Sequence, residues 1–93
     1  MYIVVIENTA KKDCIEEYKL ASQKFMNEMK TLPGMIDAEV WQDNTHPEQI
    51  LNVMMWESEE ASKIDDGSVF LKHKSELKPY FVTNTMRTYS ACE

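Results

Sequence analysis

The chain has 93 residues, of which 43% are hydrophobic and 28% charged, a composition that suits one small soluble domain with a modest core. Its formal net charge of −6 lacks the basic surplus that nucleic acid or anionic lipid requires, so we expect no nucleic-acid and no membrane partner. Cys14 and Cys92 form no metal-binding motif and the apolar start is too short for a secretion signal, so we expect a cytoplasmic protein without a bound metal.

The first half of the chain predicts a strand followed by a one-sided helix. Tyr2 to Glu7 is a β-branched run that reads as a strand with Asn8 at its end. Thr9 or Asp13 is the expected N-cap of the helix, and Pro33 with Gly34 ends it. Its apolar stripe follows steps of three and four: Ile15, Tyr18, Ser22, Phe25, Met29 and Leu32.

A hairpin is predicted next. Residues 35–43 alternate in polarity, with Ile36, Ala38 and Val40 on one face, and the apolar run from Ile50 to Trp56 returns after a polar turn.

The last part of the chain predicts a broken helix and a final strand. Ser58 is the expected cap of a first helical piece, residues 65–67 interrupt it, and Ser68 is the expected cap of a second piece. Residues 81–89 are rich in Thr, Val and aromatic side chains, which is typical of a strand. The order β-α-β-β-α-β predicts an α+β, ferredoxin-like fold.

Apolar side chains occur on both faces of the predicted strands. Ile3 and Val5 oppose Tyr2, Val4 and Ile6, and Leu51, Val53 and Met55 oppose Ile50, Met54 and Trp56. The helices of one chain cover one face of an antiparallel sheet, so the second apolar face needs another cover. This pattern predicts a homodimer that buries the face of Ile3, Val5, Leu51 and Val53.

The segment from Trp56 to Ala61 places a strand-terminal Trp before a capped helix, and Ser68-Val69-Phe70 follows. Together with the first strand and the break Leu32-Pro33-Gly34, this order resembles the antibiotic biosynthesis monooxygenase (ABM) family. The resemblance covers nearly the whole chain. It implies a single ABM-like domain over residues 1–93, assembled as a dimeric α+β barrel with a pocket between helices and sheet.

Two polar residues are the candidate catalytic groups, Asn8 and His73. The resemblance implies that Asn8 lines the pocket, where its carboxamide can donate to a ligand; alternatively it shapes the turn before Thr9. His73 can act as a base near neutral pH, or it is a helix-surface histidine that bonds locally. The candidate substrate-binding residues are Tyr18, Phe25, Met29, Trp56 and Phe70, with Met26 as a further wall residue, although Trp56 and Trp41 also suit plain packing.

The sequence contains no phosphate loop, flavin motif or Ser/His/Asp triad. The resemblance therefore implies a monooxygenase that oxidises a small aromatic or quinol-like compound without a cofactor. A haem-binding or haem-degrading monooxygenase is an alternative, but the resemblance puts Lys74 where those relatives have a His and Asp65 where they have a Trp. A non-catalytic small-molecule-binding dimer is the third possibility.

Overall fold

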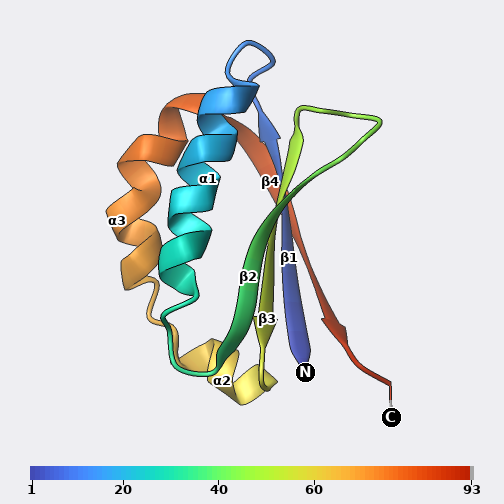
Figure 1. Ribbon diagram of the computed structural model, residues 1–93, viewed down its shortest axis with the longest axis vertical. Coiled ribbons are helices and arrows are strands. Elements are labelled where there is room, and N and C mark those ends of the chain that lie inside the picture. Colours follow the sequence, from blue (N-terminus) through green and yellow to red (C-terminus); the bar gives the residue numbers. More distant parts are fainter. Residues whose placement is uncertain (93) are drawn as a thin grey trace.

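Four antiparallel strands form one sheet in the order β2-β3-β1-β4, and the helices lie on one of its faces (Figure 1). The computed structural model describes residues 1–92. The expected order of elements is confirmed, and with it the α+β, ferredoxin-like fold. The elements are β1 (Tyr2–Ala10), α1 (Ile15–Met29), β2 (Met35–Gln42), β3 (Gln49–Trp56), α2 (Glu59–Ile64), α3 (Ser68–Leu77), the 3-10 turn η1 (Lys78–Tyr80) and β4 (Phe81–Ser90).

The division of the central strands into two faces is confirmed. β1 pairs with β3 so that Val4 lies opposite Met54 and Val5 opposite Val53. The side chains on the helix-facing side of these two strands join the core beneath α1: Tyr2, Val4, Ile6, Ile50, Met54 and Trp56. Helix α1 contributes the largest part of the opposing surface, with Tyr18, Ala21, Phe25, Met26 and Met29 buried.

The first strand is longer than expected. Ala10 still pairs with Phe81 of β4, and its backbone N–H donates to the Glu48 carbonyl at 2.8 Å. Asn8 therefore lies within β1 and not at its end, so the expectation that it ends the strand is wrong. Its side chain bonds to Asn52 on β3 and to Asn84 on β4, which a turn residue beyond the strand would not do.

Two helix caps also differ from expectation. The N-cap of α1 is Cys14, whose side chain makes no capping hydrogen bond, in place of Thr9 or Asp13. The cap of α2 is Ser58, as expected, and its Oγ accepts the Ala61 N–H at 3.1 Å. The cap of α3 is Gly67 in place of Ser68, because the turn before the helix requires a left-handed residue with φ of 80°.

The expected alternation fails at the start of β2. The register between β2 and β3 shifts between Met35 and Asp37, so Ile36 does not share the buried face of Ala38 and Val40 and is 53% exposed. Alternation resumes after the shift, with Ala38 opposite Met54.

Gly34 connects the α1–β2 loop to α2. Its φ is 82°, its carbonyl accepts the Glu57 N–H at 2.8 Å, and a Cβ at this position would lie 2.7 Å from the Ala61 Cβ. A residue with a side chain is disfavoured here both by conformation and by contact. The close approach keeps α2 packed against the end of the core where β2 begins.

Within residues 1–92, no helix is both long enough and apolar enough to span a bilayer.

Candidate functional site

A cavity of about 590 Å³ lies between α1, α3 and the helix-facing side of the sheet. This volume falls within the range of roughly 300–1,000 Å³ that is usual for small-molecule sites. Apolar and aromatic side chains make up most of the wall, with a few polar groups on the sheet and on α3. The lining residues are Ile6, Asn8, Tyr18, Phe25, Met29, Asn52, Met54, Asp65, Phe70, Lys74, Leu77, Lys78, Phe81 and Asn84.

Five of the seven candidate site residues meet at this cavity. Tyr18, Phe25 and Met29 project from α1, Phe70 projects from α3, and Asn8 comes from β1. The helical stripe predicts this outcome for α1, because residues separated by seven and four positions share one face of a helix.

Three carboxamides cross the sheet at the base of the cavity. Asn52 on β3, Asn8 on β1 and Asn84 on β4 lie on adjacent strands and on the same face. Asn84 Nδ2 donates to Asn8 Oδ1 at 3.4 Å, and Asn8 Nδ2 donates to Asn52 Oδ1 at 2.7 Å. We call these three side chains the carboxamide row.

Backbone carbonyls fix the direction of the row. Asn8 Nδ2 also donates to the carbonyls of Ile50 at 3.1 Å and Ile6 at 3.3 Å, which only accept. The nitrogen of Asn8 must therefore face β3, and Asn52 must present its oxygen to it. Because an amide nitrogen carries two hydrogens, Asn8 has no donor left for a ligand.

The buried donor of the row that has no partner is Asn52 Nδ2. Its side chain is 3% exposed, and no acceptor for its Nδ2 is found among the described residues. A buried donor left without a partner costs about 1–3 kcal/mol. Sequence reasoning missed this residue, although a polar side chain at an inward position between Ile50 and Met54 was a signal that could have identified it.

Charged groups of both signs line the cavity. Lys74 and Lys78 approach from α3 and η1, and Asp65 lies ahead of α3. Neither lysine has a carboxylate within 4.0 Å in the part of the chain that the structure describes. Asp65 uses Oδ1 to accept the Gly67 N–H at 2.9 Å. The cavity is thus bordered by two exposed ammonium groups that form no ion pair within the described residues.

Tyr18 contributes a hydroxyl that stays protonated. Burial raises the pKa of its phenol to about 12. At neutral pH the Tyr18 side chain is therefore a hydrogen-bond donor or a packing surface, and it does not serve as a base.

His73 does not line the cavity. Its Nε2 lies 3.0 Å from Glu28 Oε1, its side chain is 14% exposed, and its ring packs against Phe25 with a centroid distance of 5.6 Å. Lys72 also binds Glu28, and hydrogen bonds from Lys72 and His73 lower the pKa of that carboxyl. The structure therefore places His73 at the α1–α3 contact, outside the cavity that Asn8 lines.

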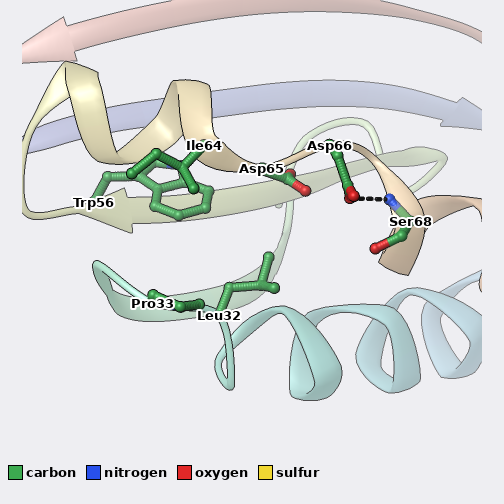
Figure 2. Close-up of a pocket in the computed structure, with 7 residues that line it drawn as sticks. All are labelled: Leu32, Pro33, Trp56, Ile64, Asp65, Asp66 and Ser68. Carbon is green, nitrogen blue, oxygen red and sulfur yellow. Dashed lines mark hydrogen bonds between the residues drawn. The ribbon is translucent and has the colours of Figure 1, made fainter.

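Trp56 lies in the core and lines a separate hollow of about 240 Å³. Figure 2 shows Trp56 and Ile64 on one side of this hollow and Leu32 with Pro33 on the other. Asp65 borders both this hollow and the larger cavity. Trp56 is thus positioned as a packing residue at the end of β3.

The remaining wall candidates lie elsewhere. Met26 borders a third hollow, between α1 and β2, and Trp41 is 48% exposed, with its indole N–H bonded to Glu39 Oε1 at 2.7 Å. Residues 1–92 bring no three His, Cys, Asp or Glu side chains together in a way that would hold a metal ion.

Comparisons with known proteins identify a family for this chain. The family model described as "Antibiotic biosynthesis monooxygenase" matches residues 1–64. No protein of curated function matches the sequence.

Solved structures share the fold at low sequence identity. A candidate antibiotic biosynthesis monooxygenase from Nitrosomonas europaea is 14% identical with a TM-score of 0.85, and the match covers 100% of both chains. One from Deinococcus radiodurans is 16% identical with a TM-score of 0.82, covering 100% of this chain and 94% of the other. A conserved protein from Methanosarcina mazei is 20% identical with a TM-score of 0.77, covering 96% and 91%. These structural matches establish the fold.

Proposed function

Because the chain belongs to the antibiotic biosynthesis monooxygenase family, we propose that it oxidises a small aromatic or quinol-like compound in the large cavity without a bound cofactor. The observation that carries this proposal is the cavity itself: about 590 Å³, with an aromatic and apolar side formed by Phe25, Phe70 and Met29. Such a wall suits a planar ring system and keeps water away from it.

The chemistry requires only an electron-rich substrate and oxygen. A phenol that becomes a quinone takes one atom of O2 as its second carbonyl oxygen, and the two hydrogens that it loses leave with the other atom as water. The substrate supplies all four electrons, so the protein needs to bind and orient the ring and to accept a proton. Asn8 contributes by fixing Asn52 at the base of the cavity.

Asp65 is the proton acceptor in this proposal. It is the one carboxylate among the described residues that line the cavity, and its Oδ2 is not used by the Gly67 N–H. His73, our candidate base from the sequence, instead supports Phe25 from the α1–α3 contact. It has the role of a positioning residue.

Oxygen uptake with a panel of phenols and quinols, and mass analysis of the product formed under ¹⁸O2, test the proposal. Asp65→Asn should reduce turnover, because the amide keeps the acceptor for Gly67 but takes up no proton. Asp66→Asn is the matched control, since Asp66 likewise caps a backbone N–H, that of Ser68, but does not line the large cavity. Equal turnover in the two variants would remove Asp65 from the mechanism.

The proposal includes a homodimer, because the face of the sheet opposite the helices is apolar and has no cover within residues 1–92. Ile3, Val5, Leu51 and Met55 on this face are half-buried, and Val53 is covered by its neighbours. Every residue of β4 from 82 to 90 is exposed, on an edge strand that pairs only with β1. An exposed edge of this length favours association, and a second copy that covers face and edge is the cover we propose.

A further inference from the structure

We propose that the large cavity and the smaller hollow beside Trp56 form one elongated site, and that its ligand is an aromatic ring that carries an apolar alkyl chain. The ring occupies the cavity, and the chain passes Asp65 and enters the hollow. This inference rests on the proposed function, because it specifies the substrate class of the same site.

The first step is that the two spaces follow one another along β3. Asn52 and Met54 line the cavity and Trp56 lines the hollow. These three residues alternate along the strand, so their side chains lie on the same face of the sheet. Asp65 borders both spaces from the opposite side. The strand is therefore a common floor, with the hollow at its C-terminal end.

The wall on the α1 side is continuous in the same way. Met29 in the last turn of α1 lines the cavity, and Leu32, three residues later, lines the hollow. The Leu32 N–H donates to the Met29 carbonyl at 3.1 Å, so a helical turn joins the two residues. On α3, Phe70 lines the cavity and Ser68 lines the hollow. A ligand that extends from one space into the other thus stays between the same three elements.

The second step is the apolar lining of the hollow. Four apolar side chains face one another across it (Figure 2): Leu32, Pro33, Trp56 and Ile64. Ile64 is 73% exposed, so a large apolar side chain at this hollow has no cover within the described residues. Asp66 and Ser68 complete the lining on the exposed side, where Asp66 Oδ1 accepts the Ser68 N–H at 2.9 Å. An alkyl chain in the hollow would remove the apolar surface of Ile64 from water, which favours binding.

The third step is the length of the chain. A strand rises about 3.4 Å per residue, so Met54 and Trp56 lie roughly 7 Å apart along β3. With carbon–carbon bonds of about 1.5 Å, an extended chain of about six carbons spans this distance. The hollow of about 240 Å³ therefore sets an upper limit on the chain that it covers, and longer chains would end in solvent.

The test is equilibrium binding of phenol and of its 4-ethyl, 4-butyl, 4-hexyl and 4-octyl derivatives, measured by calorimetric titration of the whole chain in the absence of oxygen. We expect the affinity to rise about threefold for each carbon that becomes buried, because burial of a methylene group is favourable. The rise should stop near the hexyl compound, where the hollow is filled.

A bromine atom at the end of the chain tests where the chain lies. The protein has two tryptophans, and Trp41→Phe leaves the tryptophan emission to Trp56. Bromine quenches indole emission on contact, so 4-(6-bromohexyl)phenol should quench Trp56 strongly at saturation. The control ligand is 4-bromophenol, whose bromine stays with the ring in the cavity and should quench several-fold less.

One variant assigns the effect to the hollow. Ile64→Gln replaces an apolar wall with a polar side chain, so it should weaken 4-hexylphenol about tenfold or more while phenol binds as before. The matched control is Leu71→Gln, because Leu71 is 66% exposed, lies on α3 and lines neither space. This control should leave the affinity of every compound unchanged.

Equal affinity of phenol and 4-hexylphenol for the unaltered protein would overturn the proposal. Equal quenching of Trp56 by the two bromine compounds would overturn it too, and so would equal effects of Ile64→Gln and Leu71→Gln. The chain-length series and the quenching do not depend on the folding of Ile64→Gln. Binding as described without oxygen uptake would refute only the proposed function. Oxygen uptake with the same kcat/KM for phenol and 4-hexylphenol would refute only this inference.

Discussion

At the scale of single residues, the cavity depends on side chains whose neighbours lie far apart in sequence. The alternation of β1 places Asn8 on the helix-facing side, and the stripe of α1 places Tyr18, Phe25 and Met29 there. Asn52 was not predicted as a site residue, because its role depends on the hydrogen bond that Asn8 Nδ2 donates to its Oδ1. That bond requires the register between β1 and β3, which the sequence does not show.

The misplacement of His73 has a physical reason of the same kind. Steps of three and four on α3 permit two stripes, one through Phe70, His73 and Leu77 and one through Phe70, Lys74 and Leu77. Only the position of α1 selects between them. Since Glu28 on α1 binds His73, the second stripe is the one that lines the cavity.

Glu28 gives the first prediction. Because Lys72 and His73 hold its pKa below the ordinary value of 4.5, it contributes stability that is present above that value and is lost as the pH falls through the lowered pKa. Glu28→Gln should therefore lower the melting temperature at neutral pH, and the difference from the unaltered protein should shrink below about pH 4. Thermal melts at a series of pH values measure this.

Glu60→Gln on α2 is the control, because the structure records no ion pair for Glu60 among the described residues. A pH-independent difference at Glu28 would show that its bonds to α3 do not depend on its charge.

At the scale of elements, the sequence predicted the strands and helices well where periodicity was long and failed where single backbone angles decide. Ser58 was identifiable as a cap because a hydroxyl before two acidic residues is a local signal. Gly67 was not, because Asp65 accepts the Gly67 N–H and Asp66 accepts the Ser68 N–H, and this turn leaves the cap position to the glycine.

The two glycines give the second prediction. Both have φ near 80°, but a Cβ would meet Ala61 at 2.7 Å from position 34 and would meet nothing within 4 Å from position 67. Gly67→Ala should cost about 1–2 kcal/mol for the left-handed backbone alone. Gly34→Ala should cost clearly more, because α2 must move as well.

Urea denaturation of the two variants measures the difference in unfolding free energy. Equal losses would mean that α2 yields without cost and that Gly34 has only a conformational role.

At the scale of the whole molecule, the sequence showed that the central strands are apolar on both faces. The pattern of residues did not show what covers the face opposite the helices. A pattern of alternating apolar residues shows that a face is buried but does not show by what. The structure adds that Val53 is 1% exposed in the single chain, so a charge at this position would disturb folding as well as assembly.

Leu51 therefore gives the sharper prediction for the dimer. We expect a homodimer at micromolar concentration with an interface at or above roughly 1,200–2,000 Å². Leu51→Asp should convert it to a folded monomer, because an unpaired carboxylate in an interface is costly. Leu71→Asp is the matched control, since Leu71 is 66% exposed on α3. Sedimentation that shows the unaltered protein as a stable monomer would contradict the dimer.

Haem gives the fourth prediction, that it associates weakly and is not turned over with ascorbate. Lys74, not a histidine, lines the cavity, and an ammonium must lose its proton before it can bind iron. Titration of haem followed through its Soret band measures this. A tight one-to-one complex that His73→Ala abolishes would favour a haem-dependent activity instead.

Oxygen uptake by the metal-free protein in the presence of a phenol or quinol is the most direct test of oxidation without a cofactor. We expect uptake that depends on protein and substrate, needs no flavin, nicotinamide or metal, and places one atom of ¹⁸O2 in the product. Uptake should fall in Asp65→Asn and persist in Asp66→Asn. Substrates that bind in the cavity but cause no uptake above the protein-free rate, across the whole panel, would contradict the account.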